Sequence, residues 1–390
     1  MIERICEFMD KWHMVSAGDR VLVGVSGGAD SICLCLILKE LSTQMKFSME
    51  VIHVEHGIRG EASKRDALFV KQFCREQKLT YREFPVDVPA YAKKYHMGDE
   101  EAARKLRYDI FVKAAKEKAG TKIALAHHME DNAETMLFQL ARGSGLDGLC
   151  GMRPVRAGED SECYIRPLLE ISREQIEQYL SARGQAFCTD ATNEELVYSR
   201  NRIRHNILPQ MQEINAQAVL HMNQTAQRLW ELREYLEEET ARALQAYRTK
   251  DGQQYRISVQ GLQQLPKALR MRVLHEAVAE TAQKRKDITG AHLEAVADLL
   301  EKQTGRRVDL PYGIVAKREY DAIVLQKDPM ESAENERPEI QISQEWLEAC
   351  LDRGDPCIVP TGIRGESVAL RIFQFNGNIG EIPRKMYTTW

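Results

Sequence analysis

Short apolar runs and longer amphipathic stretches alternate along residues 20–145. The runs are rich in β-branched residues and bounded by turn residues, which is typical of buried strands, whereas the stretches have the apolar density of helices. This rhythm predicts an α/β fold with a doubly wound parallel sheet, in which ligands bind at the carboxyl ends of the strands. The expected strands lie at residues 21–25, 50–54, 80–86 and 122–126, and the expected helices at 30–41, 63–78, 99–118 and 131–142.

The pattern changes in the second half of the chain. Residues 210–304 have the Gln, Glu, Ala and Leu content of helices, and short strands are expected at 306–318 and 322–325 around a Pro-Tyr-Gly turn. Residues 328–338 are acidic, polar and bounded by prolines, and strand-like runs return near 368–373. We therefore expect a first domain over residues 1–209, a mainly helical domain with short strands over 210–327, a linker over 328–338, and a partial α+β domain over 339–390.

Composition places the chain among ordinary globular proteins. It has 390 residues, of which 43% are hydrophobic and 29% charged, and this length suits two or three domains. No stretch approaches the roughly 18 to 20 apolar residues of a membrane span, and the acidic residues among the first 13 are unlike a signal peptide. We expect a cytoplasmic protein with no membrane partner.

Nine cysteines occur at irregular spacing without a Cys-x-x-Cys pair. Neither a zinc site nor a disulfide framework is therefore indicated. Cys33 and Cys35 lie in an apolar stretch and are expected to be buried packing residues.

The net charge of −4 argues against indiscriminate nucleic-acid binding but allows local basic surfaces. Residues 199–206 contain three arginines and no acid. A solvated helix face is the competing interpretation of a second basic group. That group comprises Lys267, Arg270, Arg272, Lys284, Arg285 and Lys286.

The most informative motif is Ser-Gly-Gly-Ala-Asp-Ser at residues 26–31, between an expected strand and an expected helix. Its glycines allow a ligand to approach the backbone, and the first amides of the helix are unpaired donors with partial positive charge. Ser26 and Ser31 add hydroxyl groups, and Asp30 adds a hard oxygen ligand for Mg²⁺. A phosphate cradle is therefore expected, with an ordinary helix N-cap after a glycine turn as the alternative. The chain has neither the Walker spacing nor the Gly-x-Gly-x-x-Gly spacing here.

The loop at 26–31 resembles that of the N-type ATP pyrophosphatase, or PP-loop, superfamily. Three further motifs resemble, in order and spacing, one member of it, the tRNA(Ile)-lysidine synthetase family. They are HVEHGIRG at 53–60, EAARKLRY at 101–108 and AHHMEDNAET at 126–135. The resemblance covers essentially the whole chain. It implies an ATP-binding set of Ser26, Gly27, Gly28, Ala29, Asp30, Ser31, His56, Arg59 and His127.

Asp131 and Glu134 are three residues apart at the start of an expected helix, so both carboxylates lie on one face near its electropositive end. Together with Asp30 they are candidates for an Mg²⁺ site, with Asp30 and Asp131 as the metal ligands. A helix cap by Asp131 or Glu130, with Glu134 in solvent, is the alternative. Asp30, Asp131, Glu134 and Arg107 are the expected catalytic residues.

His127 and His128 are adjacent at a strand end, so they point to opposite faces and cannot readily share one metal ion. The family resemblance gives His127 a nucleotide contact and leaves one histidine of the pair for packing.

Basic residues supply the expected substrate contacts. Arg104 and Arg107 lie at i and i+3 on one helix, where planar guanidinium groups suit a phosphate or a carboxylate. Salt bridges to Glu100 or Glu101 are the competing account. Arg200 and Arg204 are expected to touch tRNA phosphate, and residues 166–169 and 190–193 resemble family landmarks near the nucleic acid, with loop anchoring as their alternative role.

The resemblance implies a carbon–nitrogen ligase that converts the wobble cytidine of tRNA(Ile) with a CAU anticodon into lysidine, using ATP, Mg²⁺ and L-lysine. It also implies tRNA binding by the domains after residue 209, with the chain cut inside the last of them. The alternative enzyme is a PP-loop tRNA thiolase, for which Cys150 and Cys163 would be the only suitably placed cysteines. A small-molecule amide synthetase would not need the basic tail, and a non-catalytic binding protein would not need the carboxylates. A homodimer is neither indicated nor excluded.

Overall fold

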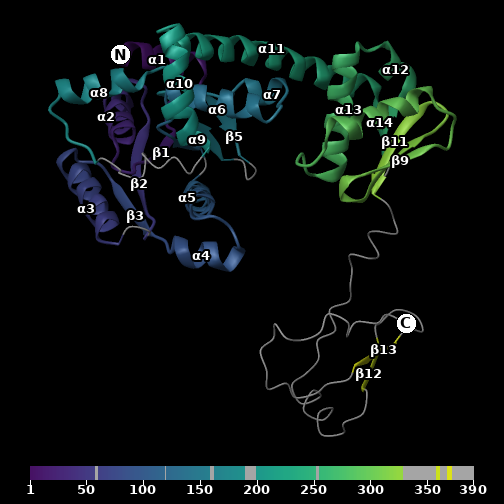
Figure 1. The fold of residues 1–390 in the computed structure, drawn as a ribbon, viewed down its shortest axis with the longest axis horizontal. Coiled ribbons are helices and arrows are strands. Elements are labelled where there is room, and N and C mark those ends of the chain that lie inside the picture. Colours follow the sequence, from purple (N-terminus) through teal and green to yellow (C-terminus); the bar gives the residue numbers. More distant parts are fainter. Residues whose placement is uncertain are drawn as a thin grey trace. The chain divides into compact units, whose positions relative to one another are not determined.

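The computed structural model describes residues 1–57, 60–118, 120–158, 162–188, 199–251, 254–327, 357–360 and 367–370. They fall into two compact units, Met1–Leu236 and Glu237–Trp390 (Figure 1).

The first unit contains a mostly parallel sheet and the helices that cover it. Its strands are β1 (Arg20–Gly24), β2 (Ser48–Glu55), β3 (Tyr81–Pro85), β4 (Thr121–Ala124), β5 (Val155–Ala157) and β6 (Cys163–Ile165). Its helices are α1 (Ile2–Lys11), α2 (Ala29–Gln44), α3 (Glu61–Glu76), α4 (Val88–Tyr95), α5 (Asp99–Lys116), α6 (Met129–Ala141), α7 (Leu146–Leu149), α8 (Arg173–Ala182), α9 (Ser199–Arg202), the π-helix η2 (Ile203–Ile207), α10 (Leu208–Ile214) and the first part of α11 (Ala218–Tyr247).

The strand order β3-β2-β1-β4-β6-β5 confirms the doubly wound fold. All neighbours are parallel except β5, which runs antiparallel to β6 at the edge. The chain moves outward from β1 to β3 on one side and continues from β4 on the other. The point between β1 and β4, where the direction reverses, is where open α/β sheets hold their ligands.

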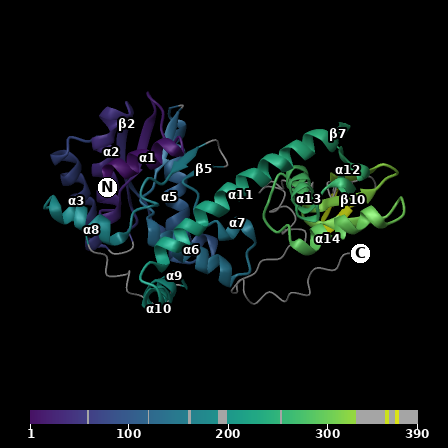
Figure 2. The ribbon, with the colours of Figure 1, turned by 90° about the horizontal axis from the view of Figure 1, so that it is seen from above.

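Alternate residues of the central strand face opposite layers. Val21 and Val23 belong to a core that includes residues of α1, α2 and α8, whereas Leu22 packs with Phe111 of α5 on the other face. Figures 1 and 2 both show α8 beside α2 on the first of these faces. Because it packs against both the sheet and α8, α2 is apolar on nearly all sides.

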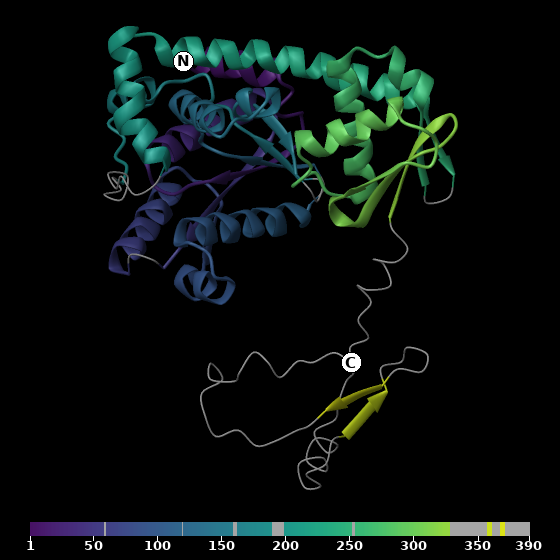
Figure 3. The ribbon, with the colours of Figure 1, turned by 45° about the vertical axis from the view of Figure 1, so that its right-hand side comes forward.

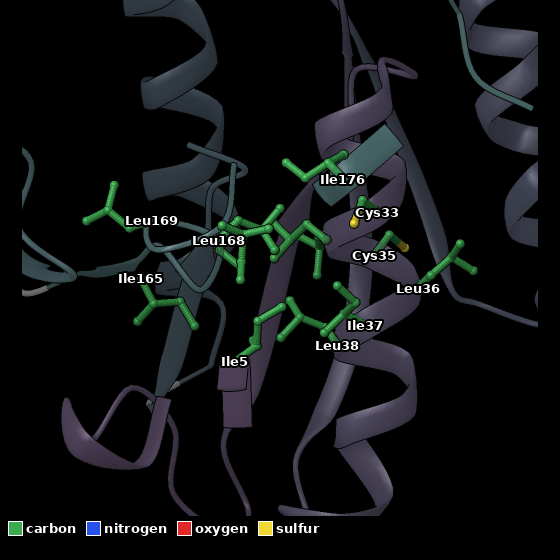
Figure 4. Close-up of a cluster of buried hydrophobic side chains, with 14 of the residues drawn as sticks. Ile5, Cys33, Cys35, Leu36, Ile37, Leu38, Ile165, Leu168, Leu169 and Ile176 are labelled. Atoms are coloured by element: carbon green, nitrogen blue, oxygen red, sulfur yellow. The ribbon is translucent and has the colours of Figure 1, made fainter. Parts of the chain in front are cut away.

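Figure 4 shows the centre of this core. Cys33 and Cys35 project from α2 among aliphatic side chains, and both are fully buried, which confirms them as packing residues. Leu168 and Leu169 lie in the same core.

The second unit has an antiparallel sheet of order β7-β8-β11-β10-β9. Figure 3 shows the green helices of this unit packed on its yellow-green strands. Among these contacts, α13 packs on β11 and α14 on β9. Besides the end of α11, its elements are β7 (Arg248–Asp251), β8 (Gln254–Ser258), α12 (Val259–Gln264), α13 (Lys267–Ala282), α14 (Gly290–Asp298), the 3₁₀ helix η3 (Leu299–Glu301), β9 (Arg307–Leu310), the 3₁₀ turn η4 (Pro311–Gly313), β10 (Ile314–Arg318), β11 (Ala322–Lys327), β12 (Cys357–Pro360) and β13 (Ser367–Leu370).

The prediction that residues 210–304 are helical was wrong at β7 and β8. Their hairpin alternates buried Tyr255 and Ile257 with less buried neighbours, and this period-2 signal is only five residues long. The strands expected around the Pro-Tyr-Gly turn are present as β9, β10 and β11.

The compact first unit extends past the boundary expected at residue 209. Leu208 and Val219 pack with Met129 of α6, and Trp230 of α11 belongs to the main core. Two buried amides reinforce this packing. Asn132 of α6 donates to the Oδ1 atom of Asn223 of α11 at 2.8 Å. The division between units therefore falls inside α11.

Candidate active site

The loop between β1 and α2 is held in shape by Ser31. Its hydroxyl donates to the carbonyl oxygen of Gly28 at 2.9 Å and accepts from the amides of Ser26 and Gly27 at 3.2 Å each. Ser31 is therefore engaged inside the loop, and both Ser26 and Ser31 line the adjacent cavity. Gly28 caps α2 with extended backbone, and Ala29 is the first helical residue.

Gly27 is required for both its conformation and its close neighbours. Its φ is +100°, and a Cβ at this position would lie 3.3 Å from the side chains of both Val70 and Cys188. The amide of Cys188 donates to the carbonyl oxygen of Gly27 at 2.9 Å. Gly28, with φ −68°, would place a Cβ 3.6 Å from the Ser26 Oγ. The segment after α8 thus packs directly behind the first glycine of the loop.

A cavity of about 240 Å³ opens at the carboxyl ends of β1 and β4. Residues from β1, β2, α5 and the segment after β4 meet there, so the predicted convergence of distant motifs is confirmed. Among the residues named from sequence, its lining includes Ser26, Gly28, Asp30, Ser31, His56, Arg104, Arg107 and His127.

Arginines form one side of the cavity. The guanidinium of Arg104 lies 5.1 Å from the ring centre of Tyr108, and burial lowers the pKa of Arg107. The Nε atom of Arg107 is buried and has no hydrogen-bond partner among the described residues. In that part of the chain neither arginine forms an ion pair with Glu100 or Glu101. The two guanidinium groups are therefore available to an anionic ligand.

A group of carboxylates begins at Asp30, which lines the cavity. Asp30, on the first turn of α2, accepts from Nη1 of Arg173 at 2.7 Å. Burial raises the pKa of Asp30, against the lowering effect of His128 and Arg173. Glu134 of α6 is 2% exposed and accepts from Nε of Arg204 at 2.6 Å.

Arg204 also donates to Oδ1 of Asp131 at 3.0 Å. Burial acts to lower the pKa of Arg204, but Glu134 and Asp131 outweigh it and raise the pKa. The expected phosphate contact of Arg204 remains a prediction. In this structure its guanidinium donates hydrogen bonds to Glu134 and Asp131. The π-helix η2 carries Arg204 and packs against α6.

His128 links the two acidic groups. Its Nε2 atom lies 3.4 Å from Oδ2 of Asp131 and 3.9 Å from Oδ2 of Asp30, and its Nδ1 atom lies 2.9 Å from Glu130. Burial opposes a charge here, but Asp131, Glu130 and Asp30 together raise the pKa of His128 to about 9. The side chain of Asp131 also caps α6 by accepting from the amide of His128 at 3.1 Å. The capping role considered for Asp131 is therefore present together with its place in the acidic cluster.

His127 lies on the cavity side of this segment. Burial lowers its pKa to about 3, assisted by the positive charge of Arg166. Arg166 donates from Nε to Nδ1 of His127 at 3.2 Å. The expectation that residues 166–169 lie near the nucleic acid stays a prediction; in the structure Arg166 contacts a histidine that lines the cavity. As expected, His127 lines the cavity and His128 is buried. Both residues lie in the segment after β4, which ends at Ala124.

Two predicted residues cannot be placed fully. Arg59 lies outside the described residues, and so does the side chain of Arg200 on α9. Arg173 and Tyr108 were missed as site residues. Arg173 contacts Asp30, which lies 143 positions away in the sequence. A local sequence pattern cannot predict a contact at that separation.

The donor set suits Mg²⁺ in chemistry, since the cation prefers carboxylate oxygens, with waters and phosphate completing the octahedron. Both Asp30 and Asp131 have a carboxylate oxygen within 4 Å of His128 Nε2, at 3.9 Å and 3.4 Å. Within the described ranges, no group of three or more His, Cys, Asp or Glu side chains is arranged to hold a metal ion.

Comparison with known proteins agrees with this geometry. Residues 1–211 match a family model described as a PP-loop domain, and residues 257–324 match one described as a TilS substrate binding domain. A U34-tRNA thiolase from Methanococcus maripaludis shares the fold, with a TM-score of 0.51 and 17% identity over 59% of this chain and 78% of that one. In the described part of the chain, no helix is long and apolar enough to cross a membrane.

Relatives of higher identity identify the family. The chain is 34% identical to a tRNA(Ile)-lysidine synthase of Caldanaerobacter subterraneus subsp. tengcongensis, over 84% of this chain and 69% of the relative. It is 35% identical to one of Dehalococcoides mccartyi, over 83% and 70%. With a PP-loop domain, a TilS substrate binding domain and these relatives, the chain belongs to the tRNA(Ile)-lysidine synthase family.

Proposed function

We propose that this chain is a carbon–nitrogen ligase that joins L-lysine to C2 of the wobble cytidine in tRNA(Ile) with a CAU anticodon. ATP first adenylates the C2 carbonyl oxygen, and pyrophosphate leaves. The ε-amine of lysine, after losing a proton, then attacks C2, and the C2–oxygen bond breaks to expel AMP. Adenylation is needed because an amine cannot displace the carbonyl oxygen of cytosine directly.

The observation that carries this proposal is the arrangement at one cavity. The loop of Ser26 and Gly28, the guanidinium groups of Arg104 and Arg107, and the carboxylate of Asp30 all line it. Backbone amides at a helix start and arginines stabilise negative charge that develops on a leaving pyrophosphate. We assign Arg107 to this charge, because its guanidinium lines the cavity and its buried Nε atom has no hydrogen-bond partner among the described residues.

Mg²⁺ would be held by Asp30 and Asp131. When bound it would supply charge neutralisation for the polyphosphate. Arg173 and His128 contact these carboxylates here and would share their oxygens with the cation.

The lysine ammonium would be positioned by Glu134 or Asp131. Both already bind a cationic side chain, that of Arg204, which shows that they accept a charged donor. An ammonium ion has an ordinary pKa of about 10.4 and is no nucleophile until it loses a proton. Arg204 would stay beside the bound amine and favour its neutral form through like-charge repulsion.

The tRNA would lie against basic residues outside the cavity. Arg200 precedes Arg204, and the second unit matches a TilS substrate binding domain. The target base must leave the anticodon stack to reach C2, which suits recognition of a single-stranded loop. We expect the reaction to occur in the cytoplasm. A thiolase would need a reactive cysteine or cluster. Cys150 is fully buried, and burial raises the pKa of the partly buried Cys163, which disfavours its reactive thiolate.

The test is incubation of the full chain with ATP, Mg²⁺, labelled L-lysine and a CAU-anticodon tRNA(Ile) transcript. Lysine retained on RNA and AMP released should appear in equal amounts, and both should vanish when the wobble cytidine is changed. AMP release without lysine transfer would indicate a different second nucleophile. Absence of both products with folded protein would refute the proposal.

A further inference from the structure

Arg166 is a buried residue fixed by one backbone and two side-chain hydrogen bonds. Its backbone amide donates to the carbonyl oxygen of Pro154 at 2.9 Å, and its Nη1 donates to the carbonyl oxygen of Arg153 at 2.7 Å. Its Nε donates to Nδ1 of His127 at 3.2 Å. Arg166 is 5% exposed, so the guanidinium has little freedom to turn away.

The chemistry of the two groups determines where the imidazole proton lies. A guanidinium has only N–H donors and no acceptor, so Nδ1 of His127 has to be the acceptor. A neutral imidazole with an acceptor at Nδ1 carries its proton on Nε2. The positive charges of Arg166, Arg104 and Arg107 and the burial of the ring all disfavour a second proton on His127.

We propose that Arg166 is a positioning residue that fixes His127 as a neutral Nε2–H donor in the nucleotide cavity. His127 lines that cavity, and Arg166 occupies Nδ1, so Nε2 is the ring nitrogen left for a ligand. The ligand atom that meets it has to be an acceptor oxygen or nitrogen. Since the ligand is taken to be ATP, this inference rests on the proposed function, although the tautomer itself does not.

His53 offers a matched comparison inside the same unit. Its Nδ1 lies 2.8 Å from the carbonyl oxygen of Val25, which can only accept, so His53 carries its proton on Nδ1. Both rings are at the carboxyl-end region of the sheet, but their partners impose opposite tautomers. One NMR spectrum of the ligand-free protein should therefore contain signals of both tautomers, Nε2–H for His127 and Nδ1–H for His53.

The first experiment is ¹⁵N–¹H correlation NMR of the ligand-free full chain with ¹⁵N-labelled histidine. His127→Gln and His53→Gln spectra assign the two rings. We expect a protonated Nε2 for His127 and a protonated Nδ1 for His53. Arg166→Met should mix the tautomers of His127 and leave His53 unchanged, while Arg166→Lys, which keeps a donor, should retain Nε2–H. A protonated Nδ1 in wild-type His127, or an unaltered tautomer in Arg166→Met, would overturn the proposal.

The second experiment measures ATP binding by calorimetry. The amide nitrogen of Gln imitates Nε2–H and that of Asn imitates Nδ1–H, so His127→Gln should bind ATP nearly as wild type and His127→Asn about tenfold more weakly. The reverse order would contradict a donor role for Nε2. If wild-type protein bound no ATP, the proposed function would fail, while the tautomers seen by NMR would still decide the role of Arg166. If Arg166→Met does not fold, the wild-type and Arg166→Lys spectra provide the decision.

Discussion

Arg204 and Glu134 form a two-bond ion pair, with Nε to Oε1 at 2.6 Å and Nη2 to Oε2 at 3.0 Å. Glu134 is almost fully buried, so this arginine supplies the charge that makes a buried carboxylate tolerable. The pair spans 70 positions of the sequence and joins η2 to α6. The same contact therefore fixes one of the carboxylates that we assign to lysine.

Arg204→Ala should destabilise the first unit by about 1–3 kcal/mol, because Glu134 would lose its charged hydrogen-bond partner while still buried. Urea unfolding followed by circular dichroism measures this change. Arg242→Ala is the matched control, since Arg242 also contacts two carboxylates but is 64% exposed. Its effect should stay within about 0.5 kcal/mol. Equal effects from the two variants would mean that Glu134 finds another partner.

Gly27→Ala should cost about 1–3 kcal/mol, because an alanine at φ +100° is strained and its methyl group would press on Val70 and Cys188. Gly28→Ala is the control in the same loop. Its backbone is extended, and its Cβ would meet Ser26 at an ordinary distance. The unfolding free energy of Gly28→Ala should therefore change by no more than about 0.5 kcal/mol. A stable Gly27→Ala protein would show that the loop adopts another conformation.

Asp30→Asn should lower AMP formation on the order of 100-fold while the protein stays folded, since the neutral amide is a poorer Mg²⁺ ligand and stabilises less charge. The rate of AMP formation is measured in the presence of ATP, Mg²⁺, lysine and tRNA. Asp109→Asn, on the exposed side of α5, removes one carboxylate that does not line the cavity and should leave the rate unchanged. A wild-type rate in Asp30→Asn would refute the proposed role of Asp30 in Mg²⁺ binding.

Stability should be greatest near the ordinary histidine pKa of 6.5. Folding lowers the pKa of His127 to about 3, so its stabilising contribution is present above pH 6.5 and is lost as pH falls toward 3. Folding raises the pKa of His128 to about 9, so its contribution is present below pH 6.5 and is lost as pH rises toward 9.

Each histidine gives a slope of at most about 1.4 kcal/mol per pH unit. Urea unfolding at several pH values, on wild type and on two variants, separates the contributions. His127→Gln should flatten the acid side of the profile and His128→Gln the alkaline side. An unchanged profile in both variants would show that other groups dominate the pH dependence.

The central strands were predictable because β1 to β4 repeat a strand-helix rhythm with helices of 13 to 18 residues after or between them. β5 and β6 are three residues each, too short for a period to appear. α4 was not predicted, although Asp87 caps it by accepting from the amide of Ala90 at 2.9 Å. Short elements such as these depend on packing that a sequence pattern does not contain.

The candidate site likewise contains residues that local spacing predicts and residues that only the fold brings together. The loop residues and the Asp131–Glu134 pair were predictable because their geometry follows from local spacing. The cations that pair with them were not, since Arg173 reaches Asp30 and Arg166 reaches His127 through the fold. The histidine protonation states depend on these distant partners, so they could be derived only from the structure.

The division of the chain inside α11 has a consequence for folding autonomy. Asn223 and Trp230 complete the core of the first unit, whereas Ala243 and Leu244 of the same helix belong to the core of the second. A fragment ending at residue 209 would leave the Nδ2 group of Asn132 without its buried acceptor and would expose the surface that Trp230 covers. The smallest catalytic fragment able to fold by itself therefore has to continue through Leu236, and a cut there would leave both fragments with part of one helix.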